Sequence, residues 1–167
     1  MIETTLTHLL KHNNWANLQL LAACEALRDE QLDAKPSAAT HGTVRETLHH
    51  FILSQEDYVS MLTTLDHPPE KAKEPTLSDL REIVEQTGQL LIDYVQNQPS
   101  QATQSHLQQL TDGYQVAPWL FFVQLINHAT EHREQIKSMM SALGLEPPRI
   151  DGWMYGRLEN GLIEPAA

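Results

Sequence analysis

The sequence predicts an all-α protein built as a four-helix bundle. Apolar residues recur at helical spacing in four long segments, and capping residues, glycine or proline mark the segment ends. No segment shows the convincing alternation of a half-buried strand, and we find no internal repeat. Four amphipathic helices with one apolar stripe each are buried most simply against one another, which favours a bundle.

Length and composition suit one domain spanning residues 1–167. Apolar residues make up 41% and charged residues 20% of the chain, which is ordinary globular usage. The formal net charge of -11 repels phosphate backbones, so we expect no nucleic-acid partner. The single cysteine, Cys24, and the lack of a signal-like or membrane-length apolar run near the N-terminus indicate a cytoplasmic protein without membrane attachment.

The first predicted helix covers residues 2–28, and its inward stripe contains two amides, Asn13 and Asn17. Cys24 lies in the same stripe and is therefore expected in the core rather than at a reactive site. The apolar members of the stripe are Ile2, Leu6, Leu9, Leu10, Leu20, Cys24 and Leu27. The second helix opens at a capping box of Thr43 and Glu46.

The third helix opens at a second capping box, Thr76 with Asp79, and its periodic residues, Leu90 among them, continue until Pro99. Residues 99–116 are polar and aperiodic, which predicts a long connection with a short turn or extended piece. This connection and the one at residues 67–75 leave room for a crossover.

The fourth helix begins at Pro118, a favoured first helical position, and ends at Gly144. Residues 149–161 are short and aromatic, and we expect a final helical turn or a lid packed on the bundle.

His128 and His132 lie four residues apart in the apolar stripe of the fourth helix, between Leu125 and Ile136. Residues at this spacing point the same way, so both imidazoles are predicted to face the core. Their ring nitrogens then need partners, which either core hydrogen bonds or a shared divalent metal would supply. The pattern alone supports both interpretations.

A catalytic zinc site usually takes three protein ligands, so a third is expected from a facing helix. Helical phase places His49 and His50 on opposite flanks of the apolar stripe of the second helix, which contains Leu48 and Phe51, and does not choose between them. The other histidines fall on helix flanks or in connections and are predicted to be solvated surface residues: His8, His12, His41, His67 and His106.

His128, Glu131 and His132 also fit the H-x-x-E-H pattern of inverted zinc peptidases, where the glutamate would act as general base. Such peptidases need a large, sheet-containing body, and no strand is predicted here. A small metallohydrolase using Glu131 is kept as a minor alternative. Otherwise Glu131 is expected at the stripe edge, beside the histidines.

Four stretches together resemble the DinB/YfiT-like superfamily of bacterial metal-binding helical bundles. "NNWANLQLLAACEAL" is similar to its opening W-A-N helix, and "GTVRETLHHF" to its R-E-x-L-x-H segment. "NHATEHREQI" resembles its N-H-x-x-H-H-R-G-Q signature, and "RIDGWMYG" a tail of some members. Residue by residue, the resemblance implies a metal site of His50, His128 and His132. Glu131 and Glu134 replace a histidine and a glycine of many members, which leaves the pocket's charge and substrate open.

The resemblance implies a four-helix bundle with a crossover connection and a short C-terminal segment, often dimeric, so we expect a homodimer. Relatives include S-transferases that use bacillithiol, mycothiol or glutathione, and a maleylpyruvate isomerase branch. We therefore expect a metal-dependent thiol S-transferase or related detoxifying enzyme, with a small-molecule thiol and an electrophile as partners. The alternative is a bundle that binds a metal or ligand without catalysis. Imidazole ligands suit several metals, of which we expect zinc or nickel.

Two further residues keep open roles. Trp15 lies opposite the main stripe of the first helix, where it suits a dimer contact or packing against the C-terminal tail. Arg133 lies well around the helix from His132, so we expect a surface ion pair, or else a contact that orients an anionic thiol.

Overall fold

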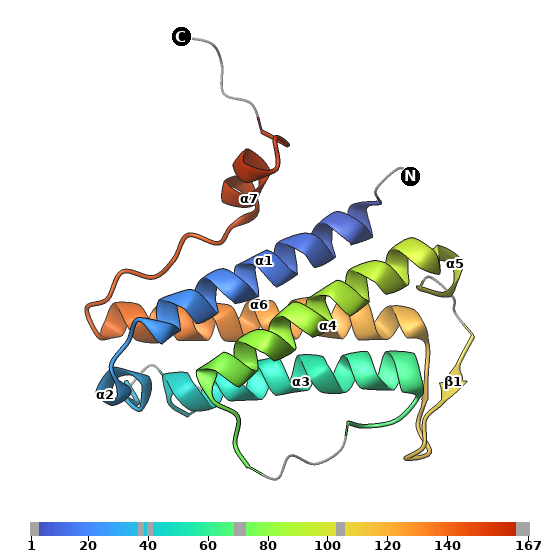
Figure 1. The fold of residues 1–167 in the computed structure, drawn as a ribbon, viewed down its shortest axis with the longest axis horizontal. Coiled ribbons are helices and arrows are strands. Elements are labelled where there is room, and N and C mark those ends of the chain that lie inside the picture. Colours follow the sequence, from blue (N-terminus) through green and yellow to red (C-terminus); the bar gives the residue numbers. More distant parts are fainter. Residues whose placement is uncertain (1–3, 37–38, 40–41, 69–72, 103–105, 163–167) are drawn as a thin grey trace.

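The computed structural model describes residues 4–36, 39, 42–68, 73–102 and 106–162, and it confirms the all-α fold class (Figure 1). The body consists of four long helices, α1 (Thr5–Glu25), α3 (Val44–Thr64), α4 (Leu77–Asn97) and α6 (Pro118–Ala142). The short elements are α2 (Asp29–Leu32), α5 (Pro99–Ala102), α7 (Gly152–Leu158) and the antiparallel strands β1 (Gln108–Gln109) and β2 (Gln115–Val116). In the described chain, no helix is both long and apolar enough to cross a membrane.

Side-chain caps fix where the helices start. The hydroxyl of Thr43 accepts the backbone N–H of Glu46 at 3.1 Å, and the Glu46 carboxylate accepts the backbone N–H of Thr43 at 2.7 Å. Thr76 and Asp79 repeat this exchange at the start of α4, at 3.2 and 2.8 Å. Each box satisfies N–H groups that the first helical turn leaves without a partner, and both predicted boxes are confirmed.

The four long helices are not joined in simple up-and-down order. α1 packs on α4 and α6, and α3 packs on the same two helices, so α1 and α3 lie diagonally across the bundle. α3 and α4 run in the same direction (Figure 1). The connection between them, residues 65–76, therefore returns along the length of the bundle, apart from residues 69–72, which lie outside the described part. This connection is the predicted crossover.

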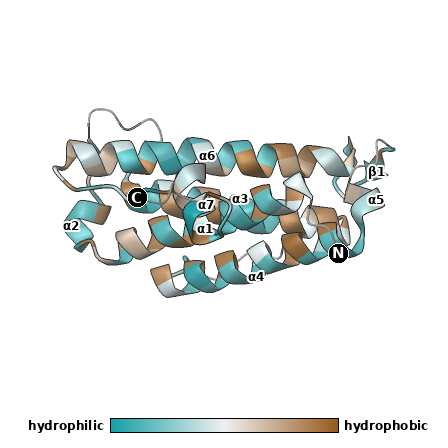
Figure 2. Cartoon of the chain, turned by 90° about the horizontal axis from the view of Figure 1, so that it is seen from above, coloured by the Kyte–Doolittle hydropathy of each residue, from teal (hydrophilic) through white to brown (hydrophobic). Residues whose placement is uncertain are grey.

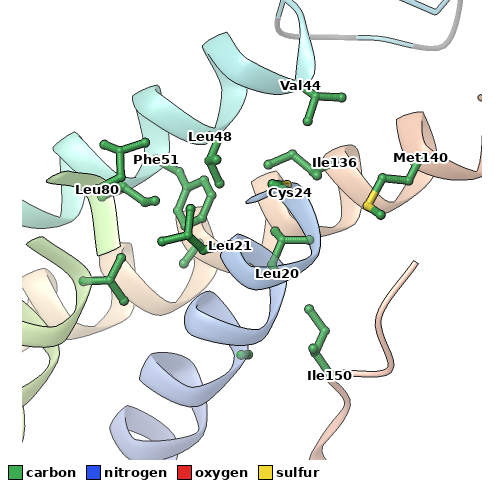
Figure 3. Packing of buried hydrophobic residues seen from close by; sticks show 14 of the residues in the cluster. Leu20, Leu21, Cys24, Val44, Leu48, Phe51, Leu80, Ile136, Met140 and Ile150 are labelled. Atoms are coloured by element: carbon green, nitrogen blue, oxygen red, sulfur yellow. The ribbon is translucent and has the colours of Figure 1, made fainter. Parts of the chain in front are cut away.

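Two apolar clusters fill the bundle, one toward each end. The first is shown in Figure 3 and includes Leu20, Leu21, Cys24, Val44, Leu48, Phe51, Leu80, Ile136, Met140 and Ile150. The second includes Leu10, Val59, Leu62, Leu91, Val95, Phe121, Phe122 and Leu125. Burying each large apolar side chain contributes about 1.5–3 kcal/mol. Cys24 belongs to the first of these clusters, as predicted, and burial raises the pKa of its thiol to about 12.

Each long helix is amphipathic, with hydrophilic and hydrophobic residues interleaved along it (Figure 2). Two predicted stripe positions are nevertheless wrong. Leu9 is 45% exposed and Leu90 is 51% exposed, so the helices that pack on α1 and α4 do not cover these two side chains.

A buried polar network separates the two clusters and joins all four long helices. Arg133 Nη1 donates to Asn13 Oδ1 at 2.7 Å and to Asn17 Oδ1 at 2.6 Å. Asn17 Nδ2 donates to Gln55 Oε1 at 3.0 Å, and Gln55 Nε2 donates to the hydroxyl of Thr87 at 2.7 Å. The amides that the sequence placed inside the bundle therefore have partners, as buried polar groups require.

The expected surface position of Arg133 is wrong, since only 4% of this residue is exposed. α1 covers this flank of α6 and offers two amide oxygens to the guanidinium. Burial lowers the pKa of Arg133 to about 10, so the side chain is still a cation at neutral pH.

The chain beyond α6 returns to α1. Ile150 is buried, and its carbonyl oxygen accepts a hydrogen bond from His12 Nε2 at 3.0 Å. The ring centroids of Trp15 and Tyr155 lie 5.3 Å apart, so Trp15 packs against the C-terminal tail. α7 forms the predicted final helical turns and lies outside the four-helix body, beside α1 (Figure 1).

Candidate metal centre

Three imidazoles meet where α3 and α6 pack together. His50 Nε2 lies 3.1 Å from His128 Nε2, and His128 Nε2 lies 3.1 Å from His132 Nε2. The three potential ligand atoms all lie within 4.8 Å of one another. The sequence pair and the partner suggested by the family resemblance are therefore brought together in one cluster, which we call the histidine trio.

Helix geometry explains this convergence. His128 and His132 are one turn apart on α6 and point the same way, as predicted. α3 crosses α6 with His50 opposite the pair, and the centroids of its ring and of the His132 ring are 4.8 Å apart. Phe51, the next residue on α3, stacks on His132 with 6.5 Å between ring centroids. An apolar ring thus limits the trio on its inner side.

The three histidines of the trio differ in their exposure to solvent. His132 is buried with 7% exposed, whereas His50 and His128 are half-buried. The cluster therefore has a closed side toward the core and an accessible side toward solvent.

A hydrogen bond fixes the orientation of the buried ring. His132 Nδ1 lies 2.8 Å from Gln135 Oε1, and an amide oxygen can only accept, so Nδ1 carries the proton and donates it. In the neutral imidazole, the lone pair is then on Nε2, the atom that faces His128.

The accessible side has one further ring. Tyr58 contacts His128 edge-on, with ring centroids 5.8 Å apart. Gln124 Nε2 donates to the Tyr58 hydroxyl at 3.3 Å across the seam between α6 and α3. This bond places the Tyr58 phenol of α3 beside the trio. Its partner, Gln124, lies one helical turn before His128 on α6.

The donor set fits a divalent transition metal. Ligand nitrogens about 2.0–2.1 Å from a tetrahedral zinc ion lie about 3.3 Å from each other. The two Nε2 separations of 3.1 Å are close to this value, and imidazole nitrogens suit zinc, copper, iron and nickel. The trio could therefore hold such an ion and leave a fourth position for a further ligand.

The structure separates His49 from His50. His49 is also buried, with 7% exposed, but it points to the connection before α4, where its Nδ1 lies 3.1 Å from a carboxylate oxygen of Glu74. His50, the next residue on α3, faces α6 instead. Helical phase could not make this choice, because it depends on which helix covers which flank.

The remaining histidines differ in their surroundings. His8 and His106 are exposed as predicted, and His41 lies outside the described residues. His12 is half-buried beneath the C-terminal tail, which contradicts its predicted surface position. Burial lowers its pKa, because the tail removes water that would solvate the protonated ring. Glu131 is exposed, and none of the described contacts joins it to the trio.

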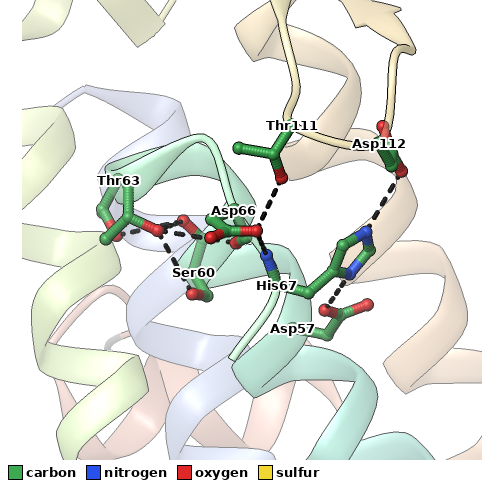
Figure 4. Close-up of polar contacts among 8 residues, drawn as sticks. Asp57, Ser60, Thr63, Asp66, His67, Thr111 and Asp112 are labelled. Carbon is green, nitrogen blue, oxygen red and sulfur yellow. Dashed lines mark hydrogen bonds and ion pairs between the residues drawn. The ribbon is translucent and has the colours of Figure 1, made fainter. Parts of the chain in front are cut away.

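His67 is exposed but forms part of a second polar cluster (Figure 4). Its Nδ1 lies 2.7 Å from Asp57 Oδ1, and its Nε2 lies 3.1 Å from Asp112 Oδ2. Thr111 donates through its hydroxyl to Asp66 at 2.6 Å. These contacts fasten the turn between β1 and β2 to the end of α3, and we call them the hairpin latch. The two carboxylates raise the pKa of His67.

The sequence model of the DinB family matches residues 1–165. The chain belongs to the DinB family. The comparison with curated proteins gave no match. Membership in the DinB family and the histidine trio together fit a metal-binding protein of that family.

Sequence reasoning on this DinB-family chain missed three residues around the trio. Gln135 carries a detectable signal, because it follows His132 by three residues and so lies on the same helix face. The helical spacing of Tyr58 from Phe51 indicates only a residue on the inward face, and Gln124 has no signal of its own. Their contact depends on the packing of α3 against α6, which no local pattern reveals.

Proposed function

We propose that this DinB-family protein is a metal-dependent thiol S-transferase, or a closely related detoxifying enzyme, with its metal held by His50, His128 and His132. The observation that carries the proposal is the convergence of three Nε2 atoms from two helices on a seam that is closed inward and accessible outward. Three protein ligands with an open position are the arrangement of catalytic zinc sites.

The protein's own residues prepare the site. Gln135 holds the His132 ring so that its Nε2 lone pair faces the cluster. Phe51 keeps water from the inner side of His132. When bound, a divalent metal would supply Lewis acidity that favours the thiolate form of a thiol.

The proposed reaction is a nucleophilic substitution. The thiol loses its proton to solvent, its sulfur forms a bond to the electrophilic carbon, and the leaving group departs with the electron pair of the broken bond. Tyr58 borders the accessible side, and its hydroxyl already accepts from Gln124, so its own proton is positioned to be donated to a substrate. We assign Tyr58 the role of orienting the substrate.

The exposure of Glu131 gives no support to the metallohydrolase alternative. A general base must lie within hydrogen-bond reach of the water that it activates. A non-catalytic metal-binding bundle is the competing function, because it would need the same three histidines.

Metal content tests the site first. Protein purified without added metal is analysed as wild type and as His50→Ala, with His49→Ala as the matched control on the next residue. We expect near-stoichiometric metal in the wild type and in His49→Ala, and at least a tenfold loss in His50→Ala. Equal metal content in all three proteins would show that the site is wrongly assigned.

Activity tests the chemistry next. The metal-loaded protein is incubated with bacillithiol, mycothiol or glutathione and with chlorodinitrobenzene, and formation of the thioether is followed by absorbance. We expect turnover with at least one thiol that disappears in His132→Ala. Stoichiometric metal without turnover would favour the non-catalytic bundle.

A further inference from the structure

α1 and the C-terminal segment with α7 line an open cavity of about 430 Å³. Its walls include His8, Leu9 and His12 from α1, and Tyr155, Gly156 and Glu159 from the C-terminal segment. The volume is within the range of small-molecule sites. None of its described lining residues belongs to the histidine trio, so the two sites are built from different side chains.

Glycines keep one wall of the cavity bare. Gly152, Gly156 and Gly161 all line it. A Cβ atom added at Gly152 would meet nothing within 4 Å, and one added at Gly156 would meet only Leu162 Cβ at 3.8 Å. This wall is therefore bare because side chains are missing there, and a Cβ atom added at Gly152 or Gly156 would make no close contact.

The other walls are largely apolar and aromatic. The His12 and Tyr155 rings meet edge-on, with 5.4 Å between their centroids, and Trp15 packs behind Tyr155. Rings arranged in this way favour a flat aromatic occupant, which can stack on one ring and meet another edge-on.

The polar groups whose roles are fixed are acceptors. His12 Nε2 faces the Ile150 carbonyl oxygen at 3.0 Å, and because a carbonyl only accepts, Nε2 carries the proton. Burial lowers the pKa of His12, so at neutral pH the ring is neutral and its Nδ1 is an acceptor. Glu159 is the one carboxylate among the described lining residues. A matching ligand has to bring N–H donors.

Charge points to a cationic donor. The chain carries a formal charge of -11, and its field concentrates cations. Near His12 the buried Arg133 and the carboxylate of Asp151 act in opposite directions: Arg133 lowers the pKa of His12 and Asp151, with the smaller effect, raises it. The carboxylate of Glu159 and the face of the Tyr155 ring both attract an ammonium group.

We propose that the cavity between α1 and α7 binds a small arylalkyl amine, with its ring against His12 and Tyr155 and its ammonium group at Glu159. The probe is 2-phenylethylamine, compared with its neutral analogue 2-phenylethanol and the anion 3-phenylpropanoate. Affinities are measured by calorimetry on the full chain, and the contact residues are located from amide chemical-shift changes.

The variants separate cavity volume from charge. Gly156→Leu should fill the cavity and weaken binding of 2-phenylethylamine at least tenfold, and Gly156→Ala should have a smaller effect in the same direction. Glu159→Gln should weaken it about fivefold, whereas Glu146→Gln, which makes the same charge change at an exposed position, should not. Circular dichroism confirms that each variant is folded.

Three results would overturn the proposal. The first is an affinity that Gly156→Leu and Glu159→Gln leave unchanged, and the second is equally tight binding of 2-phenylethanol or 3-phenylpropanoate. The third is self-association through this face, seen by sedimentation and weakened by Gly156→Leu, because a second copy would then be the occupant. His132→Ala should retain the affinity for 2-phenylethylamine, so failure of the metal site and failure of this cavity are distinguishable.

Discussion

Gln135 and His132 lie on the same face of α6, where the amide oxygen of Gln135 accepts a 2.8 Å hydrogen bond from Nδ1 of His132. This bond selects the tautomer whose lone pair faces the other two rings. Without it, the ring could rotate or place its proton on Nε2, and either change would weaken metal binding.

Gln135→Ala should therefore lower metal affinity about tenfold without removing a ligand. Competition with a chromogenic chelator measures the change. Gln89→Ala, an exposed glutamine on α4, is the control and should bind metal as the wild type does. An unchanged affinity in Gln135→Ala would mean that packing against Phe51 alone orients His132.

The hairpin latch should depend on pH in two directions. Because the pKa of His67 is raised in the folded protein, its contribution to stability is fully present below the ordinary value of 6.5 and is lost as pH rises through the folded value. The pKa of Asp112 is lowered by hydrogen bonds from the Tyr114 backbone and from His67, so its contribution is lost at acid pH instead. The latch should be firmest between these limits.

Hydrogen exchange at Thr111 reports on the latch, since its backbone N–H donates to the Leu65 carbonyl at 3.1 Å. Protection of this amide should fall as pH rises above the folded pKa of His67, after correction for the intrinsic pH dependence of exchange. His67→Gln should have low protection at every pH, and His106→Gln should behave as the wild type. Protection that is the same at pH 5.5 and pH 8.5 would contradict the role of His67.

Replacing Arg133 should destabilise the fold. Arg133→Met removes the donor of two buried amide oxygens, Asn13 Oδ1 and Asn17 Oδ1, and leaving such groups unsatisfied costs about 1–3 kcal/mol each. We expect the free energy of unfolding to fall by about 2–5 kcal/mol in urea denaturation. Arg149→Met, at an exposed position, should change it by less than about 0.5 kcal/mol. A loss below about 1 kcal/mol for Arg133→Met would show that the amides find other donors.

α1 and α4 approach so closely at Gly88 that a Cβ atom there would collide with the Asn14 side chain. Gly88→Ala should therefore destabilise the protein by about 1–3 kcal/mol, although alanine is the better helix former. Asn14 Oδ1 is buried without a hydrogen-bond partner among the described residues, so Asn14→Ala should cost little. The double variant should recover most of the loss, and thermal denaturation of all four proteins measures the coupling. Additive losses would exclude the steric explanation.

Local signals in the sequence predicted most of the fold. The pair of Thr43 and Glu46 marks a helix start because the two residues satisfy each other's backbone N–H groups, which is a purely local exchange. The phase of His128 and His132 on their helix is equally local. Strands of two residues carry no usable periodicity, so β1 and β2 could be anticipated only as an extended piece.

The wrong predictions share a different cause. Each depended on which distant helix or segment covers the residue in the folded protein. Arg133 was misplaced because its burial depends on α1 packing beside α6, and His12 because its cover comes from the distant segment around Ile150. The choice between His49 and His50 had the same origin. Periodicity gives the direction of a side chain around its own helix, while the neighbour that it meets is decided by topology.

The network around Arg133 has a consequence for the uniqueness of the fold. Apolar helix faces tolerate sliding by one turn, because one leucine can replace another in the same gap. A shift of α1 or α3 by one turn would carry Asn13, Asn17 or Gln55 away from its partner and strand a buried cation, which costs several kcal/mol. The buried polar network therefore favours a single alignment of the four helices along their axes. In that alignment His50 lies opposite His128.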